Sequence, residues 1–146
     1  MVVGYKISSD TKQMDLSVIH GYLSDSYWAK GVSLSTMQTA VSNSFCFGVF
    51  TDAGQQVAFA RMITDYATFA YLADVFVLPE HRGKGVSKWL VQTIIDDPKL
   101  QKLRQVLLAT NDAHNLYKQF GFSALASPAL FMELHRPDIY QKKCNT

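Results

Sequence analysis

The chain has 146 residues, 48% hydrophobic and 12% aromatic, and its 14 Lys and Arg against 12 Asp and Glu give a formal net charge of +2. This length and composition predict a single domain over residues 1–146 with a sizeable core. The small net charge, without a long basic run, argues against a nucleic-acid partner, and no stretch reaches the ~18 apolar residues of a membrane span.

Hydrophobic periodicity predicts alternating strands and helices along the chain. Helices are expected where apolar residues recur at helical spacing, as at Leu16, Ile19 and Leu23, and strands where β-branched and aromatic residues cluster. In chain order we expect a strand over 3–8, helices over 13–27 and 34–42, a hairpin of 45–51 and 55–64, a strand over 68–78, a helix over 84–96, a strand over 104–110, a helix over 112–120, and strands near 122–126 and 129–135. This order predicts a mixed sheet with helices on both faces.

The strand that follows the hairpin is nearly all apolar, which predicts burial on both of its faces. Strict alternation would turn Leu72, Asp74 and Phe76 to one face. Asp74 is a charge in this apolar strand, and a buried carboxylate needs a hydrogen bond, a water or a role. It could accept a proton from an ammonium, or it could be a structural carboxylate paired with Arg61 or Lys84.

A basic turn with two glycines, Arg82-Gly-Lys-Gly85, joins this strand to an amphipathic helix that begins near Val86. A helix start leaves free backbone N–H groups and carries partial positive charge, and glycine lets the backbone approach an anion closely. The turn therefore predicts a pyrophosphate site. The alternative is a solvated basic turn that only caps the helix. The segment fits neither the P-loop pattern nor the dinucleotide-binding glycine pattern.

A second informative segment follows the strand over 104–110. Ala113, Leu116 and Tyr117 fall at helical spacing, and Gly121 follows where a helix typically ends. On spacing alone, Tyr117 is a packing residue of an amphipathic helix.

Together the two segments resemble the GNAT superfamily of acetyl-CoA-dependent N-acetyltransferases. The coenzyme A signature of that superfamily, Arg/Gln-x-x-Gly-x-Gly/Ala, reads here from Arg82 to Ser87, with Ser87 in place of the final Gly or Ala. The tyrosine segment supplies Ala113, Leu116-Tyr117 and Gly121-Phe122 of the family pattern. The resemblance extends over nearly the whole chain. It implies an α/β (α+β) fold, with a mixed, mostly antiparallel sheet of about six or seven strands flanked by about four helices.

The resemblance also implies how acetyl-CoA would bind. The amides from Arg82 to Ser87 would hold the pyrophosphate, and the backbone near Phe76 would pair with the pantetheine arm like an added strand. Family members often carry Asn where this chain has Thr110. The implied cofactor-binding residues are Val75, Phe76, Val77, Arg82, Gly83, Lys84, Gly85, Val86, Ser87, Thr110, Asn111 and Asn115.

Within this reading, Tyr117 is a candidate general acid and Asp74 a candidate general base. A tyrosine with a pKa near 10 can protonate a leaving thiolate whose conjugate acid has a pKa of roughly 8.5. The amine would attack the thioester directly, because no Cys or Ser resembles an activated nucleophile. A splayed junction beside residues 75–77 would orient the acetyl carbonyl.

The acceptor side gives a weaker signal. Tyr27 and Trp28 end the first predicted helix, where the family walls its acceptor pocket, and Tyr71 lies on the central strand. Aromatic side chains can pack on an amine's carbon skeleton or hold a cation, and Arg61 could recognise a carboxylate. Ordinary packing and charge pairing are the alternatives. The acceptor is expected to be a primary amine of a small molecule or peptide.

Other features limit the partners. No His, Cys, Asp or Glu spacing suggests a metal site. Cys46 is expected to be a buried small hydrophobe and Cys144 to be inert. The N-terminus lacks a signal-peptide layout, so we expect a cytoplasmic protein without membrane contact. The alternative functions are a non-catalytic acyl-CoA sensor and an interaction module, and the resemblance also allows a homodimer through the C-terminal strands.

Overall fold

The computed structural model describes residues 1–141, so Cys144 lies outside the described residues. The helices and strands are β1 (Tyr5–Ser8), η1 (Thr11–Gln13), α1 (Leu16–Leu23), α2 (Leu34–Ser42), β2 (Phe45–Thr51), β3 (Gln56–Thr64), β4 (Phe69–Val77), η2 (Pro79–His81), α3 (Val86–Ile95), η3 (Pro98–Leu100), β5 (Gln105–Leu108), α4 (His114–Lys118) and η4 (Pro128–Leu130).

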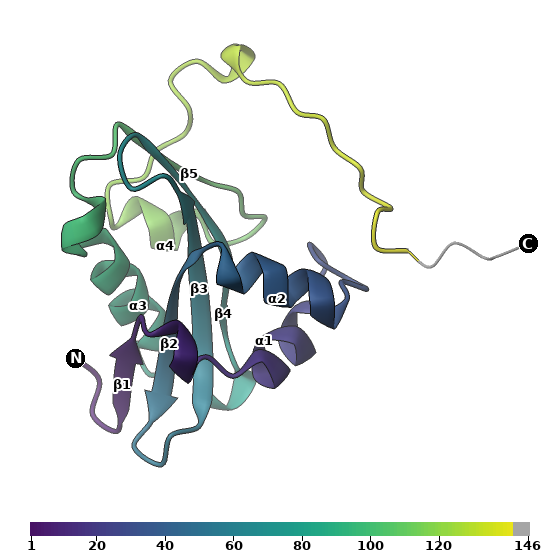
Figure 1. The fold of residues 1–146 in the computed structure, drawn as a ribbon. Helices are drawn as coiled ribbons and strands as arrows, with labels where there is room; N and C mark the ends of the chain where they lie inside the picture. The colour runs from purple at the N-terminus through teal and green to yellow at the C-terminus, as the bar shows by residue number, and fades with distance from the viewer. Residues whose placement is uncertain (142–146) are drawn as a thin grey trace, which may run out of the picture.

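The sheet has five strands in the order β1-β2-β3-β4-β5. Each of β1 to β4 pairs antiparallel with the next, and β4 pairs parallel with β5 through the α3 crossover. Figure 1 shows α1 and α2 on one side of the sheet and α3 and α4 on the other. Two hydrophobic clusters match these layers: one joins α3 to the sheet, and the other joins α1 and α2 to it. The predicted mixed sheet with helices on both faces is confirmed.

Polar side chains fix both ends of α1. The Asp15 carboxylate accepts hydrogen bonds from the backbone N–H groups of Ser17 and Val18, so α1 begins later than the predicted residue 13. After Leu23, the Ser26 hydroxyl donates to the Leu23 carbonyl and accepts from the Ala29 N–H, which turns the chain out of the helix. The predicted helix over 13–27 was therefore too long at both ends, whereas the helix over 34–42 is confirmed.

A β-bulge at Asp74 breaks the alternation of β4. Phe59 pairs with Phe76 and Arg61 with Ala73, so three steps on β4 oppose two on β3. Asp74 has a φ of 56°, which is rare for a non-glycine residue. The predicted common face for Leu72 and Phe76 was therefore wrong, because the extra residue places them in clusters on opposite sides of the sheet.

The parallel strands β4 and β5 separate part of the way along their length. Their pairing runs from Phe69 with Gln105 to Leu72 with Leu108 and ends there, whereas β4 continues to Val77. Residues 73–77 consequently present a backbone edge that β5 does not cover. This uncovered edge lies where the family resemblance implied a splayed junction.

The chain after α4 corrects two predictions. Residues 122–126 and 129–135 form no strand in the described chain, so the predicted count of six or seven strands was too high. Pro128 starts the short η4 turn, and the backbone of residues 123–141 makes only local hydrogen bonds within the described residues. Leu130, Met132 and Leu134 are more than three-quarters exposed, at 80%, 98% and 81%.

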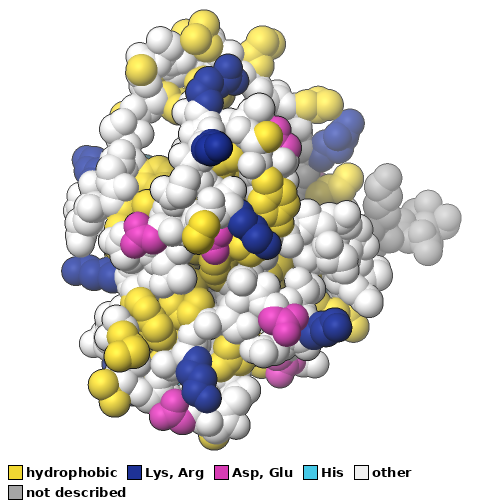
Figure 2. All heavy atoms as spheres, turned by 60° about the vertical axis from the view of Figure 1, so that its left-hand side comes forward, with side chains coloured by type: hydrophobic (Ala, Val, Ile, Leu, Met, Phe, Trp, Pro, Cys, Tyr) yellow, Lys and Arg dark blue, Asp and Glu magenta, His cyan; other side chains and the backbone are white. Residues whose placement is uncertain are grey.

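In Figure 1 this segment leaves the body near η4 and arcs back toward the side of α1 and α2. Figure 2 shows hydrophobic side chains standing out at the top of the molecule, the height at which Figure 1 places η4. On the same face the Lys and Arg side chains stand apart from one another. Within residues 1–141, no helix combines the length and apolar character needed to cross a membrane.

Candidate active site

One cavity of about 1080 Å³ brings most of the predicted site residues together. It extends from the start of α3, along the uncovered edge of β4, to the loop after α1. The predicted residues that line it are Tyr27, Trp28, Arg61, Tyr71, Asp74, Val75, Phe76, Val77, Arg82, Gly83, Gly85, Val86, Ser87, Thr110, Asn111 and Tyr117. Lys84 and Asn115 are the two predicted residues that do not line it.

The start of α3 is a backbone cradle without a side-chain cap. Gly85 is the N-cap residue, its φ is 82°, and no side chain caps the helix. Gly83 also has a left-handed φ, of 75°. Within the described residues, the first N–H groups of α3 therefore point toward the cavity end of the helix without a side-chain acceptor. Such a helix start binds anions through its N–H groups and its dipole, which fits a pyrophosphate.

Arg82 is held in place beside this cradle. Its Nε donates to the Val77 carbonyl at 2.9 Å, and its Nη2 donates to the Tyr22 hydroxyl at 2.9 Å. The Tyr22 ring stacks on Phe76 with centroids 4.2 Å apart. The Arg82 guanidinium thus ties the end of β4 to α1, so its positive charge has a fixed position next to the cradle.

Tyr117 reaches the cavity from α4. The side chain is 7% exposed and packs edge-on against Phe122. Burial, followed by the negative charge of Asp112, raises the pKa of the Tyr117 hydroxyl above its ordinary value of 10.0. Tyr117 lines the cavity, and within the described residues its hydroxyl takes part in no hydrogen bond, so its proton is available to a group in the cavity.

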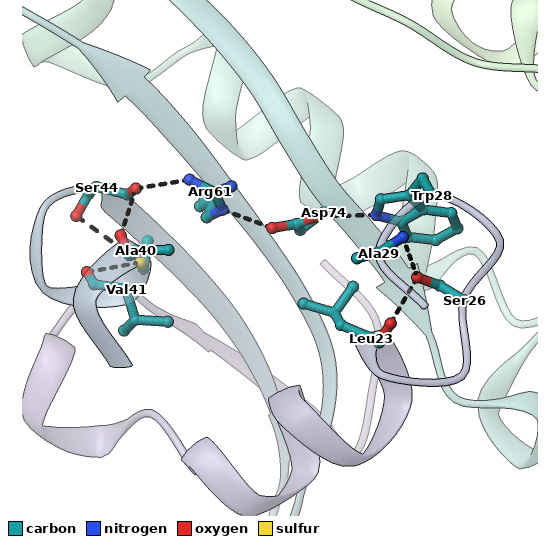
Figure 3. A network of polar contacts seen from close by, with 10 residues as sticks. Leu23, Ser26, Trp28, Ala29, Ala40, Val41, Ser44, Arg61 and Asp74 are labelled. Carbon is teal, nitrogen blue, oxygen red and sulfur yellow. Dashed lines mark hydrogen bonds and ion pairs between the residues drawn. The ribbon is translucent and has the colours of Figure 1, made fainter. Parts of the chain in front are cut away.

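Asp74 lies in the centre of a line of polar contacts. Its Oδ2 lies 2.6 Å from Nε of Arg61, and its Oδ1 accepts a hydrogen bond from Nε1 of Trp28 at 2.8 Å. Arg61 in turn donates from Nη1 to the Ser44 hydroxyl at 3.1 Å. Figure 3 shows this line running from Ser44 through Arg61 and Asp74 to Trp28. The pairing of Asp74 with Arg61, one of the two alternatives for this carboxylate, is present, and no contact to Lys84 accompanies it in the described chain.

Cys46 lies next to this line of contacts but is shielded from the cavity. The thiol is buried, as predicted, and burial raises its pKa from 9.0 to about 11 against the opposing effect of Arg61. A thiol with this pKa stays protonated near neutral pH and is a poor nucleophile.

Aromatic side chains wall the part of the cavity beside the loop after α1. Tyr27 meets Trp28 edge-on with centroids 5.0 Å apart, and Trp28 lies 6.5 Å from Tyr22. The Trp28 hydrogen bond to Asp74 ties this wall to the β4 bulge. This hydrogen bond therefore holds the aromatic wall against β4, where the wall faces the cavity.

The sequence did not identify every residue that lines the cavity, and Met37, Ala40 and Tyr140 are three examples. Met37 and Ala40 come from α2, where their helical spacing is that of any packing face. Tyr140 comes from the C-terminal segment, and no local pattern indicates that this segment returns to the cavity.

Comparison with known proteins gives a consistent assignment. The family model described as an acetyltransferase (GNAT) domain matches residues 42–124, which include the cradle and Tyr117. A Gibberella zeae protein named "Putative acetyltransferase FG08082" is 32% identical over 135 residues, covering 77% of this chain and 75% of its own.

Solved structures share the whole fold. The Xanthomonas campestris pv. campestris protein xcc2953, described as belonging to the GNAT family, has a TM-score of 0.93 and 49% identity over 97% of this chain and 100% of its own. A predicted acetyltransferase from Clostridium acetobutylicum, crystallised with acetyl-CoA, has a TM-score of 0.63 and 16% identity over 90% of this chain and 94% of its own, so it shows the fold alone.

Proposed function

Because the chain belongs to the GNAT acetyltransferase family, we propose that it transfers the acetyl group of acetyl-CoA to a primary amine by direct attack. The observation that carries this proposal is one cavity that joins an uncapped helix start, an uncovered strand edge and a free tyrosine hydroxyl. The three features suit, in order, a pyrophosphate, an extended pantetheine arm and a leaving thiolate.

The chain's own residues suit the binding of acetyl-CoA, which supplies a thioester carbonyl. The first amides of α3 hold the pyrophosphate, and Arg82 adds its fixed charge beside them. The edge of β4 at residues 75–77 lines the cavity between the cradle and Asp74, where an N–H group can bind the developing oxyanion. Lys84 and Asn115, which do not line the cavity, remain predictions as cofactor contacts.

In the chemical step, the amine nitrogen forms a bond to the carbonyl carbon and the carbon–sulfur bond breaks. Tyr117 donates its hydroxyl proton to the departing sulfur, and its raised pKa keeps that proton in place until the thiolate forms. Asp74 accepts the proton that the amine loses, directly or through a water. Its carboxylate has about four lone-pair sites, of which Arg61 and Trp28 occupy two.

The first test is calorimetric titration of the protein with acetyl-CoA, with free CoA and NAD as comparison ligands. Binding of acetyl-CoA and CoA but not NAD supports the proposal and justifies a screen of primary amines. No binding at millimolar acetyl-CoA would rule out both the transferase and a CoA-sensing role.

We also propose that the protein forms a homodimer through its C-terminal segment. Leu130, Met132 and Leu134 are highly exposed apolar side chains within five consecutive residues, and burial of their apolar surface would be favourable. Sedimentation equilibrium of the full chain tests this, with Leu130→Asp and Leu134→Asp together as the disrupting variant and the equally exposed Val3→Asp as control. A wild-type monomer at all concentrations would refute the dimer.

A further inference from the structure

The C-terminal segment reaches the cavity. Tyr140 lines the cavity together with Tyr27, Trp28 and Tyr71. These four tyrosine and tryptophan side chains come from three separate parts of the chain: the loop after α1, strand β4 and the returning segment. They place aromatic surface around the position that an acceptor must occupy to reach Asp74.

A glycine allows this segment to lie so close. Gly31 has a φ of 83°, and a Cβ built there would lie 2.9 Å from the backbone oxygen of Tyr140. A side chain at position 31 would therefore push Tyr140 away from the loop that carries Tyr27 and Trp28. Gly54 has a similar φ of 91°, but a Cβ built there would meet no atom within 4 Å. A substitution at Gly54 therefore strains the backbone in the same way without a steric clash.

The acceptor end offers little free positive charge. Of the described residues that line it, Arg61 is the basic one, and its Nε and Nη1 are already bonded to Asp74 and Ser44. Arg82 lies beside the cradle, and its Nε and Nη2 are already bonded to the Val77 carbonyl and the Tyr22 hydroxyl. A phosphate or carboxylate on the acceptor would have to leave water and lie against aromatic side chains without a cation to pair with. The desolvation free energy of such an anion is unfavourable.

We infer that Tyr140, with Tyr27, Trp28 and Tyr71, selects a primary amine on an apolar, uncharged carbon body over amines that carry a phosphate or carboxylate. This inference rests on the proposed function and names its substrate class. The apolar body packs on the aromatic faces, and the amine is directed toward Asp74.

The test compares three acceptors with the full chain and acetyl-CoA: 2-phenylethylamine, phenylalanine and 2-aminoethyl phosphate. Phenylalanine differs from 2-phenylethylamine only by its carboxylate. We expect kcat/KM for 2-phenylethylamine to exceed both others by about tenfold or more. Equal or better use of either charged amine would overturn the inference.

Two variants test the role of Tyr140. Tyr140→Ala and Gly31→Ala should each raise KM for 2-phenylethylamine about tenfold while kcat and acetyl-CoA affinity stay unchanged. Gly54→Ala, the matched control, should change neither constant. An unchanged KM in both variants, or an equal effect in Gly54→Ala, would refute the assignment of Tyr140.

Calorimetry separates the two levels of failure. If acetyl-CoA binds but 2-phenylethylamine neither binds the acetyl-CoA-loaded protein nor is acetylated, the substrate class is wrong and the proposed function stands. If acetyl-CoA does not bind, the proposed function fails, and the inference that rests on it fails too.

Discussion

The carboxylate of Asp74 lies 2.6 Å from Nε of Arg61, and this contact joins β3 to β4 across the bulge that interrupts their pairing. The side chains are 8% and 16% exposed, so the pair is largely shielded from water. A non-glycine residue with a left-handed φ costs about 1–3 kcal/mol and persists where its surroundings hold it. The ion pair and the Trp28 hydrogen bond provide that constraint at the centre of the cavity.

Removal of Arg61 should destabilise the protein. Arg61→Ala leaves the Asp74 carboxylate with one hydrogen-bond donor, Trp28, and we expect a loss of roughly 3–5 kcal/mol in unfolding free energy. Urea unfolding followed by circular dichroism measures it.

The companion variant is Asp74→Asn, because Asn tolerates the left-handed backbone conformation. Combined with Arg61→Ala it removes the uncompensated charge and should recover part of the lost stability. A double variant no more stable than Arg61→Ala would contradict this account. With Arg61 intact, Asp74→Asn should also lower kcat if Asp74 accepts the amine's proton.

Removal of the Tyr117 hydroxyl should lower kcat and leave acetyl-CoA affinity unchanged. Tyr117→Phe keeps the packing against Phe122 and removes a hydroxyl that has no partner in the described chain, so unfolding free energy should change little. Loss of a general acid should lower kcat by about 10²-fold or more. Steady-state kinetics with a responsive amine and calorimetry with acetyl-CoA give the two readouts. Tyr66→Phe, which alters an exposed tyrosine that does not line the cavity, is the control.

The pH profile provides an independent check on Tyr117. Because its pKa is raised above 10.0, the group stays protonated at neutral pH and loses its proton only at pH values above 10. We expect kcat to hold on the alkaline side until that range and then fall. The fall should be absent in Tyr117→Phe, and an identical alkaline limb in both proteins would assign it to another group.

The cradle can be tested at a single glycine. Gly85→Ala forces an alanine into a φ of 82°, which costs about 1–2 kcal/mol, and distorts the N–H groups at the start of α3. We expect acetyl-CoA affinity to fall about tenfold or more. Gly4→Ala carries the same backbone penalty at a φ of 90° outside the cavity, so it should lower stability alone. Equal acetyl-CoA affinities in the two variants would argue against the cradle.

Ionisation of Cys46 should lower the free energy of unfolding between about pH 9 and pH 11. Its folded pKa of about 11 lies above the ordinary 9.0, so the unfolded chain releases this proton first as the pH rises. The stabilisation is complete below pH 9 and is lost toward pH 11, by up to roughly 3 kcal/mol. Urea unfolding at pH 8, 9, 10 and 11 should therefore show a steeper decline in wild type than in Cys46→Ala. Parallel declines would mean that the thiol ionises equally in both states.

Local sequence patterns were sufficient for the elements that depend on short-range chemistry. The helix over 34–42 was predicted from its apolar spacing, and in the structure the Ser33 hydroxyl also caps it by accepting from the Thr36 N–H. The glycines at the strand-to-helix junction predicted an open helix start, and α3 begins there without a side-chain cap. The family resemblance added the expectation that Tyr117 shares a site with that cradle, and both line one cavity. The helix prediction succeeded because capping and amphipathic packing act within a few residues, and the cofactor roles of the cradle and Tyr117 stay predictions.

Tertiary structure decided what depends on distant partners. The bulge that turns Asp74 toward Arg61 arises from the pairing of β3 with β4, and alternation within one strand cannot reveal it. The C-terminal residues have strand-like composition, yet they form no strand because no neighbouring strand pairs with them in the described chain. The return of Tyr140 to Gly31 is likewise a contact between residues more than a hundred positions apart. A strand, a bulge and a cavity wall each form only through hydrogen bonds and packing with a second segment of the chain. Local sequence determines which residues they contain, and the tertiary structure determines whether they form.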